Sequence, residues 1–364
     1  MRSFLKLSSV LALVFMTASA PAAAPSAAVV QGTGPAFQSI GPLAFAPDGT
    51  LFAGDTAQAS IFAVDLGAAA SGGAQGSAAV TGIDQKIASL LGTAPNEIAI
   101  TDLAVHPKTR QSFVSVMRGV GAAAKPALLR VDGAGAITLV AMDSLKFSKV
   151  ALTNAPDAAN RNQRNQAIMD IAVTNGRLFV AGLSNEEFAS KMWSIAYPFV
   201  SADRGTSIEI FHGNHGRLET RSPIFSFVPY TVDGKPTLIA GYLCTPLVKI
   251  PVDSLSAGNK VLGTTIAELG NQTRPIDMVV YKKDGKEFLL MSNTARGVMK
   301  IPTATFGSET PITAPVPTGT AGVKYETIAS MTGIEQLDLL DATRSIVIAK
   351  AADGSRSLQI VILP

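Results

Sequence analysis

Short apolar strand patterns recur along the whole chain in a fixed order, and this repetition limits the possible folds more than any other feature. Each repeat begins with two strands joined by a tight turn. These hairpins span residues 43–54, 102–116, 170–182, 225–241, 277–290 and 337–349. Four of the turns are Asp-Gly or Asn-Gly, pairs that tolerate the positive φ angles of a tight hairpin turn. The chain is therefore expected to be built from antiparallel hairpins.

A third strand follows each hairpin, and the spacing leaves room for a fourth. The third strands start at residues 61, 128, 192, 247, 298 and 358. Outer strands are predicted at 137–140, 207–211, 261–266 and 325–329. Four strands repeated at this interval are typical of propeller blades. We predict an all-β fold, a six-bladed β-propeller with four-stranded antiparallel blades, forming a single domain over residues 37–364.

The two ends of the chain suggest how such a ring is closed. The last repeat ends at Pro364 directly after its third strand, whereas an unassigned apolar stretch, Ala27 to Val30, precedes the first repeat. A ring without open strand edges is protected from aggregation. We therefore expect an N-terminal strand to complete the last blade. One break in the period, Ile83 to Leu91, has the apolar spacing of a short amphipathic helix.

The N-terminus predicts export. Arg2 and Lys6 precede a short apolar run, and Ala18-Ser19-Ala20 supplies small residues for a signal peptidase. Residues 1–20 are thus expected to be a cleaved Sec-type signal peptide, followed by an Ala/Pro-rich leader over residues 21–36. The mature protein would be periplasmic or extracellular, and no later apolar stretch is long enough to span a membrane.

Charge and cysteine content exclude several functions. Without Arg2 and Lys6 the formal net charge falls from +3 to +1, so neither nucleic acid nor an anionic membrane is an expected partner. Cys244 is the single cysteine, which excludes disulfides and thiolate-rich metal sites; we expect it to be a small buried side chain. Motifs for covalent haem, a nucleophile elbow, a phosphate-binding loop and a zincin helix are missing from the sequence.

Generic blade features such as Ala46-Pro47-Asp48-Gly49 and His106-Pro107 resemble the propeller group of NHL-repeat and SMP-30/gluconolactonase-like proteins. The resemblance covers most of the mature chain. It implies the propeller architecture and a place for a divalent metal at the mouth of the central channel, where SMP-30-like lactonases use Glu, Asp and Asn ligands. Their ligand set does not align onto this chain residue by residue.

Three aspartates begin inner strands, and the propeller topology would gather them around the channel mouth: Asp102, Asp170 and Asp277. Converging carboxylates repel one another unless they are solvated, paired or bridged by a cation. Oxygen ligands of this kind would suit Ca²⁺ or Mg²⁺. Asp170 or Asp277 could then be the catalytic ligand or base of a hydrolase. The alternative is that each carboxylate caps its strand by accepting backbone N–H bonds.

A second candidate metal site lies in the loop after the third repeat. His212 and His215 stand three residues apart in a Gly-containing segment, and Glu219 follows. Two imidazoles and a carboxylate could bind a Zn²⁺-like ion. The alternative is a polar loop whose histidines bond to backbone carbonyls.

Several polar side chains are predicted on the same rim of the propeller and could hold an anionic ligand. They are Arg118, Arg164, Arg217, Arg221, Asn293 and Arg296. Alternatively, the arginines neutralise nearby acids, namely Asp102, Asp170, Asp277, Glu186 and Glu187.

The sequence is compatible with three functions. It does not decide whether the protein is an enzyme. The first is an exported, non-enzymatic binding or scaffold propeller whose rim loops meet a small anionic ligand or an extracytoplasmic protein. The second is a metal-dependent hydrolase, lactonase- or esterase-like, with one divalent cation (Ca²⁺, Mg²⁺ or Zn²⁺). The third is an accessory protein of a periplasmic redox system. We expect a monomer in each case.

Overall fold

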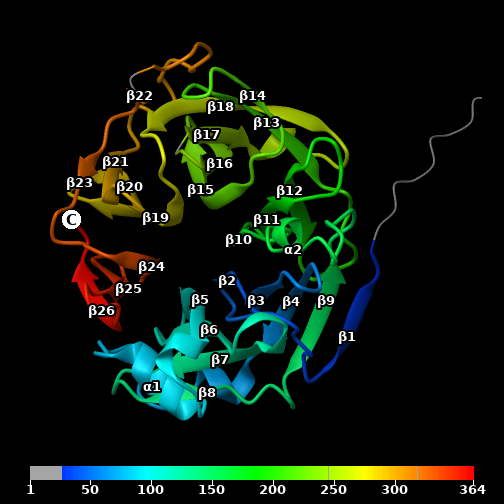
Figure 1. Ribbon diagram of the computed structural model, residues 1–364, viewed down its shortest axis with the longest axis vertical. Coiled ribbons are helices and arrows are strands. Elements are labelled where there is room, and N and C mark those ends of the chain that lie inside the picture. The colour runs from blue at the N-terminus through cyan, green and yellow to red at the C-terminus, as the bar shows by residue number, and fades with distance from the viewer. Residues whose placement is uncertain (1–26, 245, 318) are drawn as a thin grey trace, which may run out of the picture.

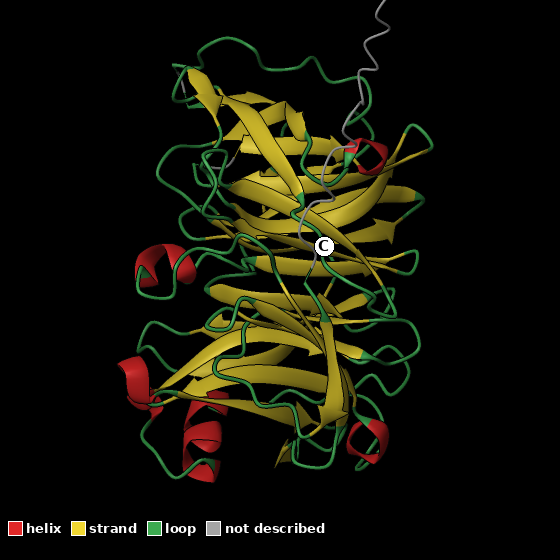
Figure 2. Ribbon diagram, turned by 90° about the vertical axis from the view of Figure 1, so that its right-hand side faces the viewer, coloured by secondary structure: helices red, strands yellow, loops and turns green. Residues whose placement is uncertain are grey.

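The sheets of the protein are arranged around a central axis, as a computed structural model shows (Figure 1). The structure describes residues 27–244, 246–317 and 319–364. Seen from the side, the strands run between two faces that are covered by loops (Figure 2). The prediction of an all-β propeller is confirmed. The predicted signal peptide and residues 21–26 of the predicted leader lie outside the described residues.

Five hydrogen-bonded sheets make up the described part of the ring. The first sheet contains, from the axis outwards, β2 (Leu43–Phe45), β3 (Leu51–Asp55), β4 (Ser60–Asp65), β9 (Lys146–Ala151) and β1 (Val29–Thr33). The second contains β5 (Ile98–Val105), β6 (Ser112–Arg118), β7 (Lys125–Val131) and β8 (Ile137–Leu139). Both consist of antiparallel pairs.

The largest sheet joins two antiparallel units edge to edge. One unit is β10 (Asp170–Thr174), β11 (Arg177–Leu183), β12 (Ser190–Ala196) and β13 (Thr206–His212), with β14 (Arg217–Glu219) added to β13. The other is β15 (Ile224–Val232), β16 (Lys235–Tyr242), β17 (Pro246–Pro251) and β18 (Lys260–Leu269), with β22 (Thr320–Gly322) added to β18. A parallel pairing of β13 with β18 connects the two units.

Two smaller sheets complete the ring. One contains β19 (Pro275–Lys283), β20 (Lys286–Asn293), β21 (Gly297–Pro302) and β23 (Glu326–Thr327). The other contains β24 (Ile334–Leu339), β25 (Arg344–Lys350) and β26 (Arg356–Ile362). Three of the four predicted Asp-Gly and Asn-Gly turns have the expected geometry, because Asn175, Asp233 and Asp284 and the glycine after each have positive φ angles, whereas at Asp48-Gly49 only the glycine does.

Helices are short and lie between or beside the sheets. The predicted amphipathic helix is confirmed as α1 (Ile83–Leu90), and α2 (Arg161–Arg164) is a single turn. The 3₁₀ helices are Gly67–Ala70, Pro95–Glu97, Gly121–Ala123 and Val252–Ser254. No helix in the described ranges has both the length and the hydropathy of a membrane span.

The predicted ring closure by an N-terminal strand is wrong. Strand β1 pairs with β9 in the first sheet, and β26 remains the last strand of a three-stranded sheet. Strand β9 itself follows β8 in sequence, yet it inserts between β4 and β1. The chain thus leaves the first sheet, builds the second, and returns to complete the first.

This return makes the order of sheets around the axis differ from their order in sequence. Strand β2 contacts β5 on one side and β10 on the other, and the ring continues through β15, β19 and β24 back to β5. The ring therefore closes between the sheet of residues 98–139 and the sheet of residues 334–362, away from β1 (Figure 1).

Three kinds of contact hold the closing junction. An isolated bridge joins Val80 to Leu358, with N–O distances of 2.8 and 2.9 Å. Helix α1 packs beside β26, and a shared core includes Ile83, Leu103 and Ile348. On the axis, Asp338 Oδ2 on β24 accepts the backbone N–H of Val105 on β5 at 2.7 Å, and Oδ1 accepts the N–H of Leu339.

Replacing Asp338 by Ala should destabilise the ring. The change removes the acceptor of two N–H groups, and each buried donor left unpaired costs about 1–3 kcal/mol. We expect the free energy of unfolding in urea to fall by about 2–4 kcal/mol, and by less for Asp338→Asn, which keeps one acceptor oxygen. The exposed Asp253→Ala should change it by no more than about 0.5 kcal/mol. Equal stability of the two Ala variants would contradict a role for Asp338 in closure.

Candidate functional site

The aspartates predicted at the channel do converge there, together with one that was not predicted. Asp102, Asp170, Asp277 and Asp338 line a central cavity of about 410 Å³. They come from β5, β10, β19 and β24, the innermost strands of their sheets. The sequence pattern had placed Asp338 in an inner strand without marking it as a channel residue.

Each of the four carboxylates makes the same pair of hydrogen bonds. One oxygen accepts the N–H of the next residue in its own strand. The other accepts an N–H from the adjacent inner strand around the axis: Asp102 from Leu43 (2.5 Å), Asp170 from Phe227 (2.7 Å), Asp277 from Leu337 (2.8 Å) and Asp338 from Val105 (2.7 Å). We call this arrangement the aspartate clasp. It fits the alternative in which these residues cap strands.

Burial dominates the electrostatics of the clasp. It raises the pKa of Asp170 to about 7 and that of Asp338 to about 6, although backbone N–H bonds act in the opposite direction. Burial and repulsion among the aspartates also raise the pKa of Asp102 and Asp277 well above the usual range. Proton binding is thus one way in which the clasp relieves its charge repulsion.

The predicted histidine loop forms a second polar centre on one face of the ring. Strand β13 ends at His212, a tight turn over residues 213–216 follows, and β14 returns beside β13. The two imidazole rings lie with their centroids 3.8 Å apart. His212 is buried, whereas 39% of the His215 side chain is exposed, so the pair is accessible from one side.

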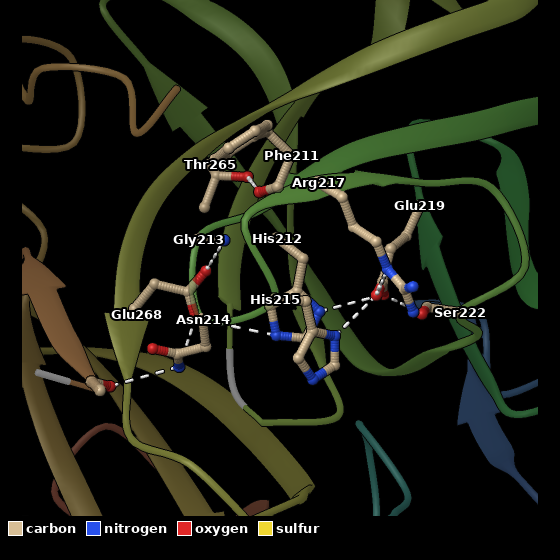
Figure 3. A network of polar contacts seen from close by, with 11 residues as sticks. Phe211, His212, Gly213, Asn214, His215, Arg217, Glu219, Ser222, Thr265 and Glu268 are labelled. Atoms are coloured by element: carbon tan, nitrogen blue, oxygen red, sulfur yellow. Dashed lines mark hydrogen bonds and ion pairs between the residues drawn. The ribbon is translucent and has the colours of Figure 1, made fainter. Parts of the chain in front are cut away.

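Glu219 orients both histidines by contacting the Nδ1 atom of each ring (Figure 3). Its Oε2 lies 3.0 Å from His212 Nδ1 and its Oε1 lies 2.6 Å from His215 Nδ1. Ser222 Oγ also donates to Glu219. Burial opposes ionisation of Glu219, but the hydrogen bonds from His212, Ser222 and His215 outweigh it and hold the pKa of Glu219 well below its usual range. In neutral imidazoles, an ionised carboxylate bonded to both Nδ1 atoms leaves both Nε2 atoms as acceptors.

Glu268 lies on the other side of His212 (Figure 3). Its buried carboxylate accepts the N–H of Gly213 at 2.6 Å and the side-chain N–H of Asn214 at 2.9 Å. Its Oε2 is 4.0 Å from His212 Nε2, beyond hydrogen-bond distance. His212 Nε2 is buried and has no hydrogen-bond partner among the described residues. A buried imidazole nitrogen of this kind is suited to a ligand.

Cys244 completes the cluster. The loop between β16 and β17 brings it to the histidine pair, and one ligand atom from each of His212, His215 and Cys244 lies within 4.8 Å of the other two. Among residues 27–244, 246–317 and 319–364, this is the one group of three or more His, Cys, Asp or Glu side chains found to be placed so that they could hold a metal ion. Cys244 is half-buried, and its φ of 59° places a non-glycine residue in the left-handed region.

The geometry therefore differs from both metal sites expected from the sequence. Glu219 contacts the histidines through their Nδ1 atoms, which is how carboxylates outside a metal centre orient histidine ligands. The aspartates of the clasp direct their oxygens to backbone N–H groups. Cys244 was expected to be only a small buried side chain, and Glu268 was not considered. Both lie far from residue 212 in sequence, so only the fold brings them together.

The arginines expected to bind an anion are spread over several locations. Arg118 donates to the carbonyl of Gly92, and Arg217 Nε lies 3.4 Å from Glu219 Oε1. Arg221 and Arg296 are exposed. Arg164 lines a large groove in another part of the molecule.

Asn293 and Glu186, which were predicted on the same rim, have partners other than a ligand or the predicted arginines. Asn293 is buried; its Nδ2 donates to Thr273, and its Oδ1 accepts two backbone N–H bonds. Glu186 pairs with Lys191 at 2.7 Å and Arg204 at 2.9 Å rather than with the predicted arginines.

Comparisons with known proteins identify no family. No protein-family model and no curated protein matches the chain. A PQQ-bound aldose sugar dehydrogenase from Streptomyces coelicolor is 13% identical, with 94% of this chain and 100% of that chain covered and a TM-score of 0.34. A putative glucose dehydrogenase from Thermus thermophilus is 12% identical, with 92% and 100% covered and a TM-score of 0.32. A putative gluconolactonase is 10% identical, with 94% and 93% covered and a TM-score of 0.34.

The clasp predicts how stability depends on pH. Asp170 in the unfolded chain loses its proton near pH 4, and in the folded protein near pH 7. Between these values the folded protein binds more protons than the unfolded chain, so its stability falls as the pH rises. In Asp170→Asn this fall should be smaller when the free energy of unfolding is measured from about pH 4 to 7. Asp253→Asn is the control and should leave the profile unchanged; an unaltered slope in Asp170→Asn would refute the assignment.

Proposed function

We propose that the protein is an extracytoplasmic metal-binding propeller whose site consists of His212, His215 and Cys244. The observation that carries the proposal is the convergence of two imidazoles and a thiol within 4.8 Å, with Glu219 bonded to both Nδ1 atoms. Cysteine and histidine together favour a borderline or soft ion, and both imidazole and thiolate are ligands that Zn²⁺ accepts. Of the cations suggested by the sequence, Zn²⁺ therefore fits better than Ca²⁺ or Mg²⁺.

The residues around the proposed ligands support the same assignment. Glu219 would fix the tautomer and orientation of both rings, as carboxylates commonly do for histidine ligands. The unpaired, buried Nε2 of His212 would gain the partner that it lacks among the described residues. Metal binding would require the thiol of Cys244 to lose its proton, so binding should release a proton to the solvent.

A second candidate function, a metal-dependent hydrolase, is favoured by the number of ligands and by access. Three protein ligands leave a fourth position, which in catalytic zinc sites is taken by water or substrate. The exposed side of His215 and the half-buried Cys244 would allow a substrate to approach. This proposal moves the metal from the channel mouth, where the sequence pattern had suggested it, to the histidine loop.

Metal content tests the first proposal. We expect purified protein loaded with Zn²⁺ and dialysed to retain one ion per chain, and Cys244→Ser, His212→Ala and His215→Ala each to lose it. Loading at about 100 times the Kd should stabilise the fold by about 2.7 kcal/mol, a rise in Tm of a few degrees. Glu219→Gln should bind about 10- to 100-fold more weakly. His106→Gln, which changes the remaining histidine, should retain the ion.

Cobalt gives an independent spectroscopic test of the thiol. Co²⁺ bound through sulfur absorbs in the near ultraviolet by charge transfer from thiolate to metal, and this band should be lost in Cys244→Ser. Wild-type protein that binds neither Zn²⁺ nor Co²⁺ would overturn the metal site. Stoichiometric binding with no sulfur band would remove Cys244 from the ligand set.

Hydrolysis separates the two proposed functions. Under the hydrolase proposal, the Zn²⁺-loaded protein should hydrolyse a member of a panel of lactones and simple esters. Its turnover should stop on addition of a chelator, return with Zn²⁺ and be absent in Cys244→Ser. Metal-loaded protein without turnover on the whole panel would favour a binding role.

A further inference from the structure

A large cavity lies away from both the clasp and the histidines. It measures about 1300 Å³, against about 410 Å³ for the cavity that the clasp lines. Four segments border it: residues 35–40, the start of β7, residues 139–143 and α2. These segments meet because β9 returns the chain to the first sheet, which sets residues 140–165 beside the segment that precedes β2.

The cavity has mainly apolar walls. Phe37, Ile40, Met117, Leu128 and Met142 line it, with several alanines and prolines between them. Leu139 also lines it and is 47% exposed. Open apolar surface of this kind on a folded protein often marks a place where a ligand or partner covers it.

Positive charge accompanies the apolar walls. Lys125, Arg161 and Arg164 line the cavity, whereas Asp143 is the single acidic residue among the described lining residues. Arg161 and Lys125 are exposed. Arg164 is held in place, because its guanidinium donates to the carbonyls of Ala57 (3.0 and 3.1 Å) and Pro156 (2.7 Å). Those bonds use three of its five N–H groups and leave two for a ligand.

The wall formed by residues 35–40 is also held rigidly. The buried carboxylate of Asp55 accepts the N–H of Gln38 at 2.7 Å and the N–H and hydroxyl of Ser39 at 3.2 and 2.8 Å. Gln58 donates to the same carboxylate and to the carbonyl of Ala36. A wall fixed by these bonds loses little conformational entropy when a ligand binds.

We propose that this cavity, the 35–165 groove, binds a small amphipathic anion: a carboxylate attached to an apolar alkyl or aryl body. The apolar walls take the body, and the cations formed by Lys125, Arg161 and Arg164 take the carboxylate. An inorganic anion would leave the apolar walls uncovered, and a neutral apolar molecule would leave the cations unused. The groove is independent of the proposed metal site, since none of its lining residues belongs to that site.

Three related probes test which property the groove recognises. Decanoate carries both an apolar body and a carboxylate, decanol lacks the charge, and acetate lacks the body. In titration calorimetry at pH 8, with a chelator present and below the micelle concentration, decanoate should bind one per chain. Decanol should bind at least about tenfold more weakly, and acetate should give no measurable heat. Equal affinity for decanoate and decanol would overturn the proposal.

Paired variants locate the binding site. Lys125→Gln with Arg161→Gln should weaken decanoate binding by roughly tenfold or more and leave decanol binding unchanged. Leu139→Asp should weaken both. The matched controls are Arg177→Gln, an exposed arginine elsewhere, and Leu90→Asp on α1, where Leu90 is 48% exposed. Unchanged Tm values would show that the variants fold. Decanoate affinity that survives the double change, or that falls equally in the controls, would place the ligand elsewhere and refute the groove.

Discussion

The aspartate clasp is the interaction on which the arrangement of the sheets depends. Each carboxylate accepts one N–H from its own strand and one from the next inner strand around the axis, always in the same direction. One residue thereby fixes both the end of a strand and the position of its neighbour. Burial raises the pKa of Asp102 and Asp277, and repulsion from the other aspartates adds to it, so the clasp carries an electrostatic cost that backbone N–H groups and bound protons must offset.

Two unusual strand pairings, β9 with β4 and β13 with β18, determine which loops lie side by side. Strand β9 returns to the first sheet and sets Arg161 and Arg164 beside residues 35–40, which creates the groove. The parallel pairing of β13 with β18 sets Glu268 beside His212. Gly263, which faces Ile210 in that pairing, leaves room for the side chain of Val248 on β17, because a Cβ at residue 263 would lie 2.5 Å from it. Both candidate sites thus follow from topology rather than from a continuous motif.

Strand periodicity in the sequence predicted the hairpins, which depend on residues close together in the chain. It did not predict the contacts that depend on topology. The hairpins were predictable because Asn175-Gly176 and similar pairs determine local turns. Strand β9 was not predicted, since the segment Lys146–Ala151 alternates weakly between apolar and polar residues. The histidines were found by their spacing, whereas Cys244 stands 29 residues beyond His215 and its single thiol matches no spacing rule. Glu268 reaches the site only through the parallel pairing.

The proposed metal site contains two local features that are unfavourable in the free protein. A buried imidazole nitrogen without a partner costs about 1–3 kcal/mol, and His212 Nε2 is such an atom among the described residues. A non-glycine residue in the left-handed region costs about 1–2 kcal/mol, and Cys244 is one. Glu219 meanwhile holds both rings so that neither can turn its Nδ1 towards solvent without losing a hydrogen bond to an ionised carboxylate. An ion bound by both Nε2 atoms and the thiolate would give the buried nitrogen of His212 a partner. The left-handed backbone of Cys244 would already hold the thiol beside the rings, so the two unfavourable features would belong to a preorganised site.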